Sequence, residues 1–282
     1  MVKYLNPIGS ESKMSAISPS GASSIYLVLR YFPLAFSGVI LSYVHSDISK
    51  WEQKGTYTIF VFIGIIAVYS LHKYYKLNIQ PSKDRNSRMI FGLISCSSAF
   101  LAFLLFFNLF SDYKVIGVLS FVLLITFWYV YPLFGIILRQ IKFLKGILVA
   151  LVWTIIVVWI PFHHTNFSPS LPFVMGFFFY VLALTIPFDI RDVYHDGPER
   201  FTIPQFIGIS RSKVLSVFLM FLGLGLVCLT THFKPSSVVL SMSILLVYAF
   251  LLYLQKEDTK RIYYTFFDCM LLANAGLIFF TV

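Results

Sequence analysis

The stretch that decides the fold is LPFVMGFFFYVLALTIPFDIRDVYHD, residues 171 to 196. A long apolar run leads through Pro187 directly into three aspartates, Asp189, Asp192 and Asp196. Acid is scarce in this chain, which has 12 Asp and Glu in 282 residues. The apolar run has nearly the length of a bilayer-crossing helix, about 20 residues. The sequence therefore predicts a membrane helix that delivers carboxylates to one membrane surface.

The rest of the chain repeats the apolar pattern. It is 58% hydrophobic and 12% charged, about half the charged fraction of a soluble domain. Lipid cannot satisfy open backbone groups, so closed helices are expected. We predict an all-α integral membrane protein with one nine-helix bundle in a domain of residues 25–282. The expected helices are 25–45, 56–73, 89–110, 114–137, 145–163, 171–188, 213–232, 236–254 and 262–281.

The charges predict the orientation of the bundle. Residues 1–24 are rich in Ser, Gly and Pro and are expected to form a flexible tail. With nine helices, 17 of the 22 Lys and Arg fall on the side of this tail and of the acidic cluster. The positive-inside rule then predicts a cytosolic N-terminus and a C-terminus on the far side. The net charge of +10 is accordingly read as a topology signal, and no nucleic-acid partner is expected.

The three aspartates follow a helical spacing of i, i+3 and i+7. They would fall within an arc of about 60° on one helical face. We expect the helix to extend two turns past the membrane before Gly197 and Pro198 end it. Like charges on one stripe repel unless a cation lies between them, and Mg²⁺ prefers carboxylate oxygens and bridges to phosphates. Two interpretations stay open: a Mg²⁺–diphosphate site, or a solvated turn whose acids pair with neighbouring arginines.

Three stretches resemble a known family. PFDIRDVYHD and the following FTIPQFIG, residues 187–196 and 201–208, look like the second aspartate-rich motif, D-x-x-D-x-x-x-D, of the UbiA-type intramembrane prenyltransferases. YPLFGIILRQIKFLKGILVALVW, residues 131–153, and YYTFFDCMLLANAGLIFF, residues 263–280, are also similar to that family. The resemblance spans the chain from about residue 25 to residue 282.

The resemblance implies a chemistry. The family binds a polyprenyl diphosphate through Mg²⁺ and transfers the prenyl group to an acceptor that is often an aromatic ring. Metal ions there neutralise the charge that grows on the leaving diphosphate. Carried over to this chain, the metal ligands and catalytic residues would be Asp189, Asp192 and Asp196.

The first aspartate-rich motif of the family is missing here. It belongs at the end of the second helix, where this chain reads AVYSLHKYYKLNIQ, residues 67–80. No acidic residue lies between Glu52 and Asp84. Half of the metal site that the resemblance implies therefore has no carboxylates.

Basic residues occupy the place of the missing motif. Lys73, with His72 and Lys76 at helical spacing, could contact a diphosphate directly. Alternatively, Lys73 pairs with the aspartates and fills the place of the metal, or all three residues are only the positive flank of a membrane helix. Arg139 and Lys145, around the loop before the fifth helix, either reach a diphosphate oxygen or serve topology alone.

We therefore predict a Mg²⁺-dependent membrane prenyltransferase. Its partners would be the bilayer, a polyprenyl diphosphate and an acceptor small molecule. Asp189, Asp192 and Asp196 would hold the metal, and Lys73, Arg139 and Lys145 would bind the diphosphate. The alternative is a catalytically degenerate member of the same fold that binds a lipid or partner.

Overall fold

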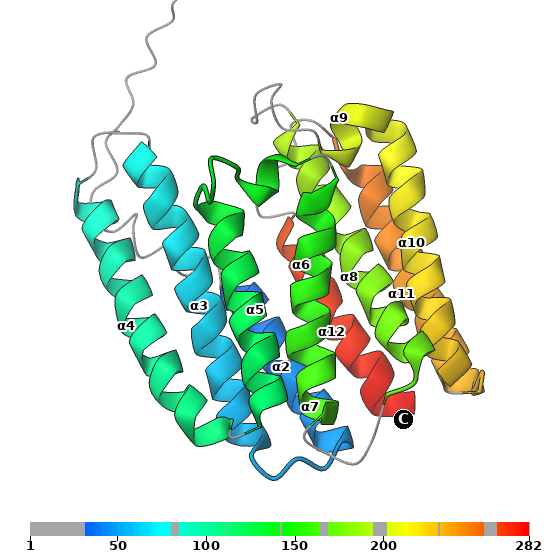
Figure 1. Ribbon diagram of the computed structural model, residues 1–282. Coiled ribbons are helices and arrows are strands. Elements are labelled where there is room, and N and C mark those ends of the chain that lie inside the picture. The colour runs from blue at the N-terminus through cyan, green and yellow to red at the C-terminus, as the bar shows by residue number, and fades with distance from the viewer. Residues whose placement is uncertain are drawn as a thin grey trace, which may run out of the picture.

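The protein is a bundle of long helices (Figure 1). The computed structural model describes residues 32–79, 85–110, 112–141, 143–163, 169–193, 202–230, 232–256 and 264–281. In these residues the helices are α2 (Phe32–Ile48), α3 (Lys54–Ile79), α4 (Arg85–Leu109), α5 (Tyr113–Val130), η1 (Leu138–Gln140), α6 (Leu144–Thr154), η2 (Ile155–Trp159), α7 (Ile160–His163), α8 (Leu171–Asp192), α9 (Ile203–Ile207), α10 (Ile209–Thr230), α11 (Pro235–Leu254) and α12 (Tyr264–Thr281).

The all-helical prediction is confirmed. Each of the nine expected windows contains a long helical segment in the described residues, with α6, η2 and α7 forming one continuous span. Seven of these segments are long and apolar enough to cross a membrane. The described part of α2 has 17 residues, and the apolar part of α12, Phe266–Phe279, is also shorter. The chain is an integral multi-pass membrane protein, and the number of nine crossings stays a prediction.

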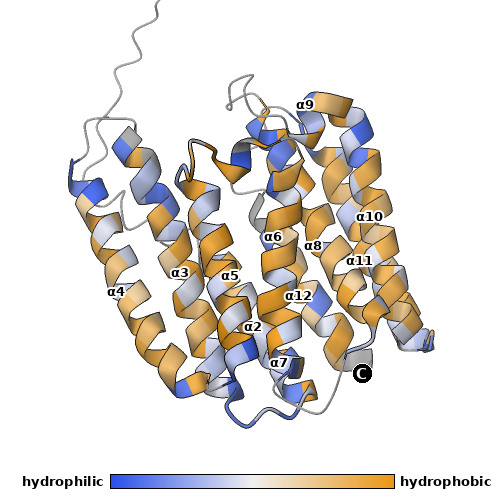
Figure 2. Cartoon of the chain, viewed as in Figure 1, coloured by the Kyte–Doolittle hydropathy of each residue, from blue (hydrophilic) through white to orange (hydrophobic). Residues whose placement is uncertain are grey.

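The outer surface is apolar across its middle. Figure 2 shows hydrophobic residues along the helices and polar residues gathered at both ends of the bundle. Large apolar side chains of α4 are more than half exposed, among them Leu93, Phe100, Phe103 and Phe107. Such surface is normal toward lipid tails, because no water is there to penalise it. The two polar ends are called here the aspartate end, where α8 finishes, and the opposite end, which carries the α2–α3 connection.

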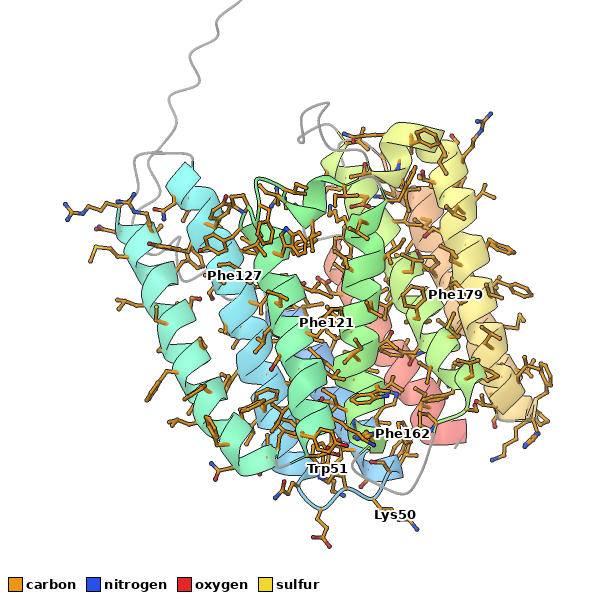
Figure 3. The ribbon with its side chains drawn as sticks, viewed as in Figure 1. Lys50, Trp51, Phe121, Phe127, Phe162 and Phe179 are labelled. Atoms are coloured by element: carbon orange, nitrogen blue, oxygen red, sulfur yellow. The ribbon has the colours of Figure 1, made fainter. Side chains whose placement is uncertain are left out.

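The interior is divided between two main hydrophobic clusters. The larger one surrounds α8, which is buried along most of its length and packs against α6, α10 and α12. The second joins α3, α4 and α5 at the opposite end, around Trp51 and Tyr57. Figure 3 shows Trp51 and Phe162 together at that end, far from Phe127 near the aspartate end.

A proline interrupts the backbone ladder of α8 just before its aspartates. Pro187 has no N–H to donate to the carbonyl of Ala183. Two hydroxyl groups from neighbouring helices donate to that carbonyl instead, Ser216 of α10 at 2.9 Å and Tyr248 of α11 at 2.7 Å. The carbonyl of Pro187 itself accepts from Nε2 of Gln255 at 2.8 Å. In this way α8 continues past the proline to Asp192.

The span after the η1 turn contains a π-helical segment, η2. Such segments leave backbone carbonyls without their usual partner. Here the hydroxyl of Tyr57 on α3 donates to the carbonyl of Ile156. Before this segment Ala150 packs in the α8 cluster, and after it Ile160 packs in the α3–α5 cluster. The segment thus ties the two clusters together.

Close backbone contact joins α8 to α10. A Cβ on Gly223 would lie 2.8 Å from the carbonyl oxygen of Gly176 and 2.8 Å from the nitrogen of Tyr180. Small residues let membrane helices approach this closely and gain packing contacts. The two glycines therefore set the distance at which the aspartate-bearing helix is held.

Gly223→Ala should destabilise the protein, because neither backbone can move without separating α8 from α10. We expect a loss of roughly 1–3 kcal/mol, the usual cost of overpacking. The midpoint of thermal unfolding in detergent measures it. Gly225→Ala on the same helix is the matched control, since an added Cβ there meets nothing within 4 Å. Equal stability of the two variants would contradict the proposed close packing.

The two hydroxyl groups at Ala183 should act redundantly. Ser216→Ala or Tyr248→Phe alone leaves one donor, so each should cost about 0.5 kcal/mol. The double variant leaves the carbonyl unsatisfied and should cost about 1–3 kcal/mol, more than the sum of the single changes. Ser243→Ala with Tyr253→Phe, two exposed positions on α11, is the control. Additive effects would show that the two hydroxyls do not share this task.

Candidate diphosphate-binding site

Two of the three aspartates predicted as a cluster, Asp189 and Asp192, form the centre of a partly buried ionic cluster. Asp189 and Asp192 lie on the last turn of α8, three residues apart and therefore on one face. Asp189 is only 2% exposed. Lys145, the second residue of α6, places its Nζ 2.6 Å from Oδ1 of Asp189 and 3.6 Å from Oδ2 of Asp192. Both carboxylates thus share one cation.

A second cation completes the charge balance. Nε of Arg191 donates to Oδ1 of Asp192 at 2.7 Å, and its guanidinium lies 5.4 Å from the ring centre of Phe188. Two carboxylates therefore face two cations in a partly buried setting. This arrangement removes the repulsion expected for a bare acidic stripe, and it differs from a solvated turn because Asp189 is shielded from water.

The connection from α5 to α6 delivers the basic residues. It contains a tight turn with left-handed Phe134 and Gly135, and Nε1 of Trp128 donates to the carbonyl of Ile136 at 3.0 Å. The turn leads into η1, which carries Arg139. Phe143, with φ of 60°, then directs the chain into α6 and Lys145.

The α3 side of the cluster consists of aromatic and basic groups. The ring of His72 on α3 lies 5.4 Å from the ring of Tyr129 on α5. Arg139 interacts electrostatically with both of these residues. Tyr129 also interacts electrostatically with Lys145, Asp189 and Asp192. Tyr129 therefore interacts both with His72 on the α3 side and with the residues of the ionic cluster.

Further tyrosines surround the end of α3. The rings of Tyr75 and Tyr131 have centres 4.5 Å apart, and Phe127 stacks on Tyr131 at 4.7 Å. Partial burial raises the pKa of Tyr131, and the neighbouring Tyr74 and Tyr75 add to the effect. The Tyr131 hydroxyl is therefore a neutral hydrogen-bond donor and acceptor at physiological pH.

The structure describes the expected extension of α8 past Pro187 as far as Asp192. The helix ends at Asp192, with Val193 as its C-cap, so it carries two of the three aspartates. Asp196 lies outside the described residues.

The predicted basic residues have different places. Lys145 is brought together with the aspartates and contacts both carboxylates, whereas Arg139 on η1 interacts electrostatically with Tyr129 and His72. Lys73 lies half-buried on α3, next to His72, and its proposed diphosphate contact stays a prediction. Tyr129 was not singled out from the sequence, because one tyrosine among 17 carries no spacing signal.

Metal-ligating groups are sparse in the part of the chain that the structure describes. It contains no group of three or more His, Cys, Asp or Glu side chains suited to hold a metal ion. At the opposite end, His163 pairs with Asp112 at 3.1 Å. The hydrogen bond from the backbone N–H of Lys114 lowers the pKa of the Asp112 carboxyl, and the interaction with His163 lowers it further. Asp189 and Asp192 are thus a pair of carboxylates, one short of a metal-binding trio.

Comparison with known proteins identifies the fold. No protein-family model and no curated sequence matches the chain. A solved UbiA homolog from Archaeoglobus fulgidus, bound to GPP and Mg²⁺, matches with a TM-score of 0.65 at 13% identity, covering 91% of this chain and 98% of that chain. A structure of digeranylgeranylglyceryl phosphate synthase matches with a TM-score of 0.56 at 13% identity, covering 92% and 98%. The chain therefore has the fold of the UbiA-type intramembrane prenyltransferases.

Proposed function

We propose that the protein is a membrane prenyltransferase that takes a polyprenyl diphosphate as donor. The observation that carries the proposal is the convergence of Asp189 and Asp192 on one cation, Lys145, at one end of a UbiA-type bundle. The UbiA homolog of the same fold was solved with GPP and Mg²⁺. The basic flanks of this end further support its placement in the cytosol, where such diphosphates would be met.

The two carboxylates fit a shared divalent cation. Mg²⁺ is often bound by one or two protein carboxylates together with substrate phosphates and water. Asp189 and Asp192 already point their oxygens at the same Nζ. When bound there, Mg²⁺ would neutralise charge on the departing diphosphate. Asp196, beyond the described residues, is proposed as a third ligand.

The basic residues would hold the diphosphate. Lys145 can exchange its carboxylate partners for a phosphate oxygen, since both are anionic acceptors at similar reach. Arg139 offers a planar fork that matches two phosphate oxygens. Lys73 is proposed as a further contact from α3. Arg191 keeps Asp192 oriented during this exchange through its 2.7 Å hydrogen bond.

The reaction would then break the bond between the first prenyl carbon and the diphosphate oxygen. The diphosphate leaves with the electron pair, and the basic residues bind the charge it gains. An electron-rich atom of the acceptor forms the new bond to carbon, and the acceptor releases a proton to water or to the departed diphosphate. Aromatic faces such as that of Tyr129 favour positive charge that develops on the prenyl group.

A second function is supported by the closed Lys145 contact. With Lys145 between the carboxylates, the cluster is neutral without any metal. The protein would then be a catalytically degenerate member of the fold that binds a lipid or a partner. The two proposals differ in whether the carboxylates accept a divalent cation when a diphosphate arrives.

Binding of geranylgeranyl diphosphate to the detergent-purified protein tests the first proposal. Wild type should bind more tightly with Mg²⁺ than with EDTA. Asp189→Asn/Asp192→Asn should lose this gain, at least about tenfold in affinity, because the amides no longer attract a cation. Isothermal titration calorimetry measures both.

Asp47→Asn/Asp112→Asn is the matched control for that experiment. It removes two aspartates at the opposite end and should bind as wild type does. Absence of binding to wild type with or without Mg²⁺ would rule out the transferase and leave the degenerate member.

Lys145→Met should make the thermal stability of the protein depend on Mg²⁺. Removing the ammonium takes from Asp189 its 2.6 Å cation and leaves Asp192 with Arg191, which should cost roughly 2–4 kcal/mol of stability in EDTA. Millimolar Mg²⁺ should restore part of the lost thermal stability, while wild type should respond little. Lys54→Met, at the exposed ion pair with Asp47, is the control. A Lys145→Met protein that is stable in EDTA and indifferent to Mg²⁺ would show that the pair does not accept the metal.

A further inference from the structure

One buried nitrogen on α3 has no hydrogen-bond partner. Nε2 of His72 is shielded from solvent, and the structure gives it no partner. Buried polar side-chain atoms in native proteins are nearly always hydrogen-bonded, and an exception calls for an explanation. Both ring nitrogens of histidine are hydrogen-bonding atoms, so Nε2 is a position at which a ligand atom can be held.

The surroundings of His72 determine which ligands are suited to it. Its ring is held between Tyr69 at 6.2 Å and Tyr129 at 5.4 Å. Arg139 acts on it electrostatically, and Tyr129 interacts electrostatically with Lys145 and the α8 aspartates. Helix α3, Lys54–Ile79, contains no Asp or Glu, so it offers no carboxylate to a metal ion. The ligand suited to His72 and Arg139 is therefore an anion.

His72 and Arg139 come from other elements than the aspartates: His72 lies on α3 and Arg139 on η1, whereas Asp189 and Asp192 lie on α8. Asp189 and Asp192 present negative charge toward Lys145, whereas His72 and Arg139 present hydrogen-bond donors and positive charge. A diphosphate has several anionic oxygens. His72 and Arg139 can bind some of them while the cluster around Lys145 binds others. An imidazole N–H and a guanidinium fork both donate to phosphate oxygens without a bridging metal.

We infer that His72, together with Arg139, forms a diphosphate-binding half-site that needs no metal ion and lies on other elements than Asp189 and Asp192. This inference rests on the proposed function and assigns the α3 half of its site. A single histidine nitrogen and an arginine there take over the binding task, and cation binding is confined to α8. The unpartnered Nε2 is the atom that contacts the diphosphate.

His72→Phe is the test, because it keeps an aromatic ring against Tyr129 and removes both nitrogens. The probe is geranylgeranyl diphosphate, titrated calorimetrically into the purified full-length chain in EDTA. Wild type should bind, and His72→Phe should bind at least about tenfold more weakly, the effect of losing a hydrogen bond to a charged group. Inorganic diphosphate should compete with the probe in wild type and much less in the variant.

Two further variants make the result specific. His72→Gln keeps a side-chain N–H and should retain most of the binding. His163→Phe makes the same exchange at the opposite end, where His163 pairs with Asp112, and should bind as wild type does. His72→Phe should also unfold at the same temperature as wild type or higher, because it removes a buried nitrogen without a partner. Loss of binding with full stability separates ligand contact from a packing defect.

The outcomes distinguish this inference from the proposed function. If wild type binds with Mg²⁺ and not in EDTA, or if His72→Phe binds as tightly as wild type, the half-site is wrong and the prenyl diphosphate proposal stands. If wild type binds under neither condition, the proposed function fails and the half-site fails with it.

Discussion

The hydrogen bonds to the carbonyl of Ala183 are the interaction on which the candidate site depends. In lipid, a backbone group without a partner is costly, and Pro187 creates one in the most buried helix of the bundle. Ser216 and Tyr248 satisfy it from two different helices. Because of them, α8 stays helical for five residues beyond the proline and carries Asp189 and Asp192 to Lys145. Packing of α10 and α11 thereby sets the position of the carboxylates.

Much of the fold follows from the sequence, because the bilayer makes apolar length decisive. The windows around residues 89–110, 171–188 and 236–254 correspond to α4, α8 and α11 within a few residues. Helix ends were less predictable. The structure describes α8 as helical to Asp192. The hydrogen bond from Gln255 to the carbonyl of Pro187, which supports the helix past the proline, is not contained in the sequence spacing.

The site was predicted in part. The aspartate spacing marked the α8 residues, and the sequence left their partner open between a Mg²⁺ ion, neighbouring arginines and Lys73 on α3. The structure gives the central contact to Lys145, since the turn at Phe134 and Gly135 carries the start of α6 to the end of α8. The local sequence does not predict that this turn brings Lys145 to the aspartates. The place of Tyr129 depends likewise on the packing of α5, so it could be found only in three dimensions.

The π-helical segment has a consequence for how one span serves two neighbours. A π turn accommodates one residue more than an α turn, and a single extra residue rotates the following side chains by about 100°. Upstream of it, Lys145 and Ala150 face α8, whereas downstream Ile160 packs with Tyr57 and Trp51 beside α3 and Phe162 packs in the α8 cluster. One membrane span therefore packs against both hydrophobic clusters. Deleting one residue of this segment would turn Ile160 and Phe162 by about 100° about the helix axis, and both would then lose their present packing partners.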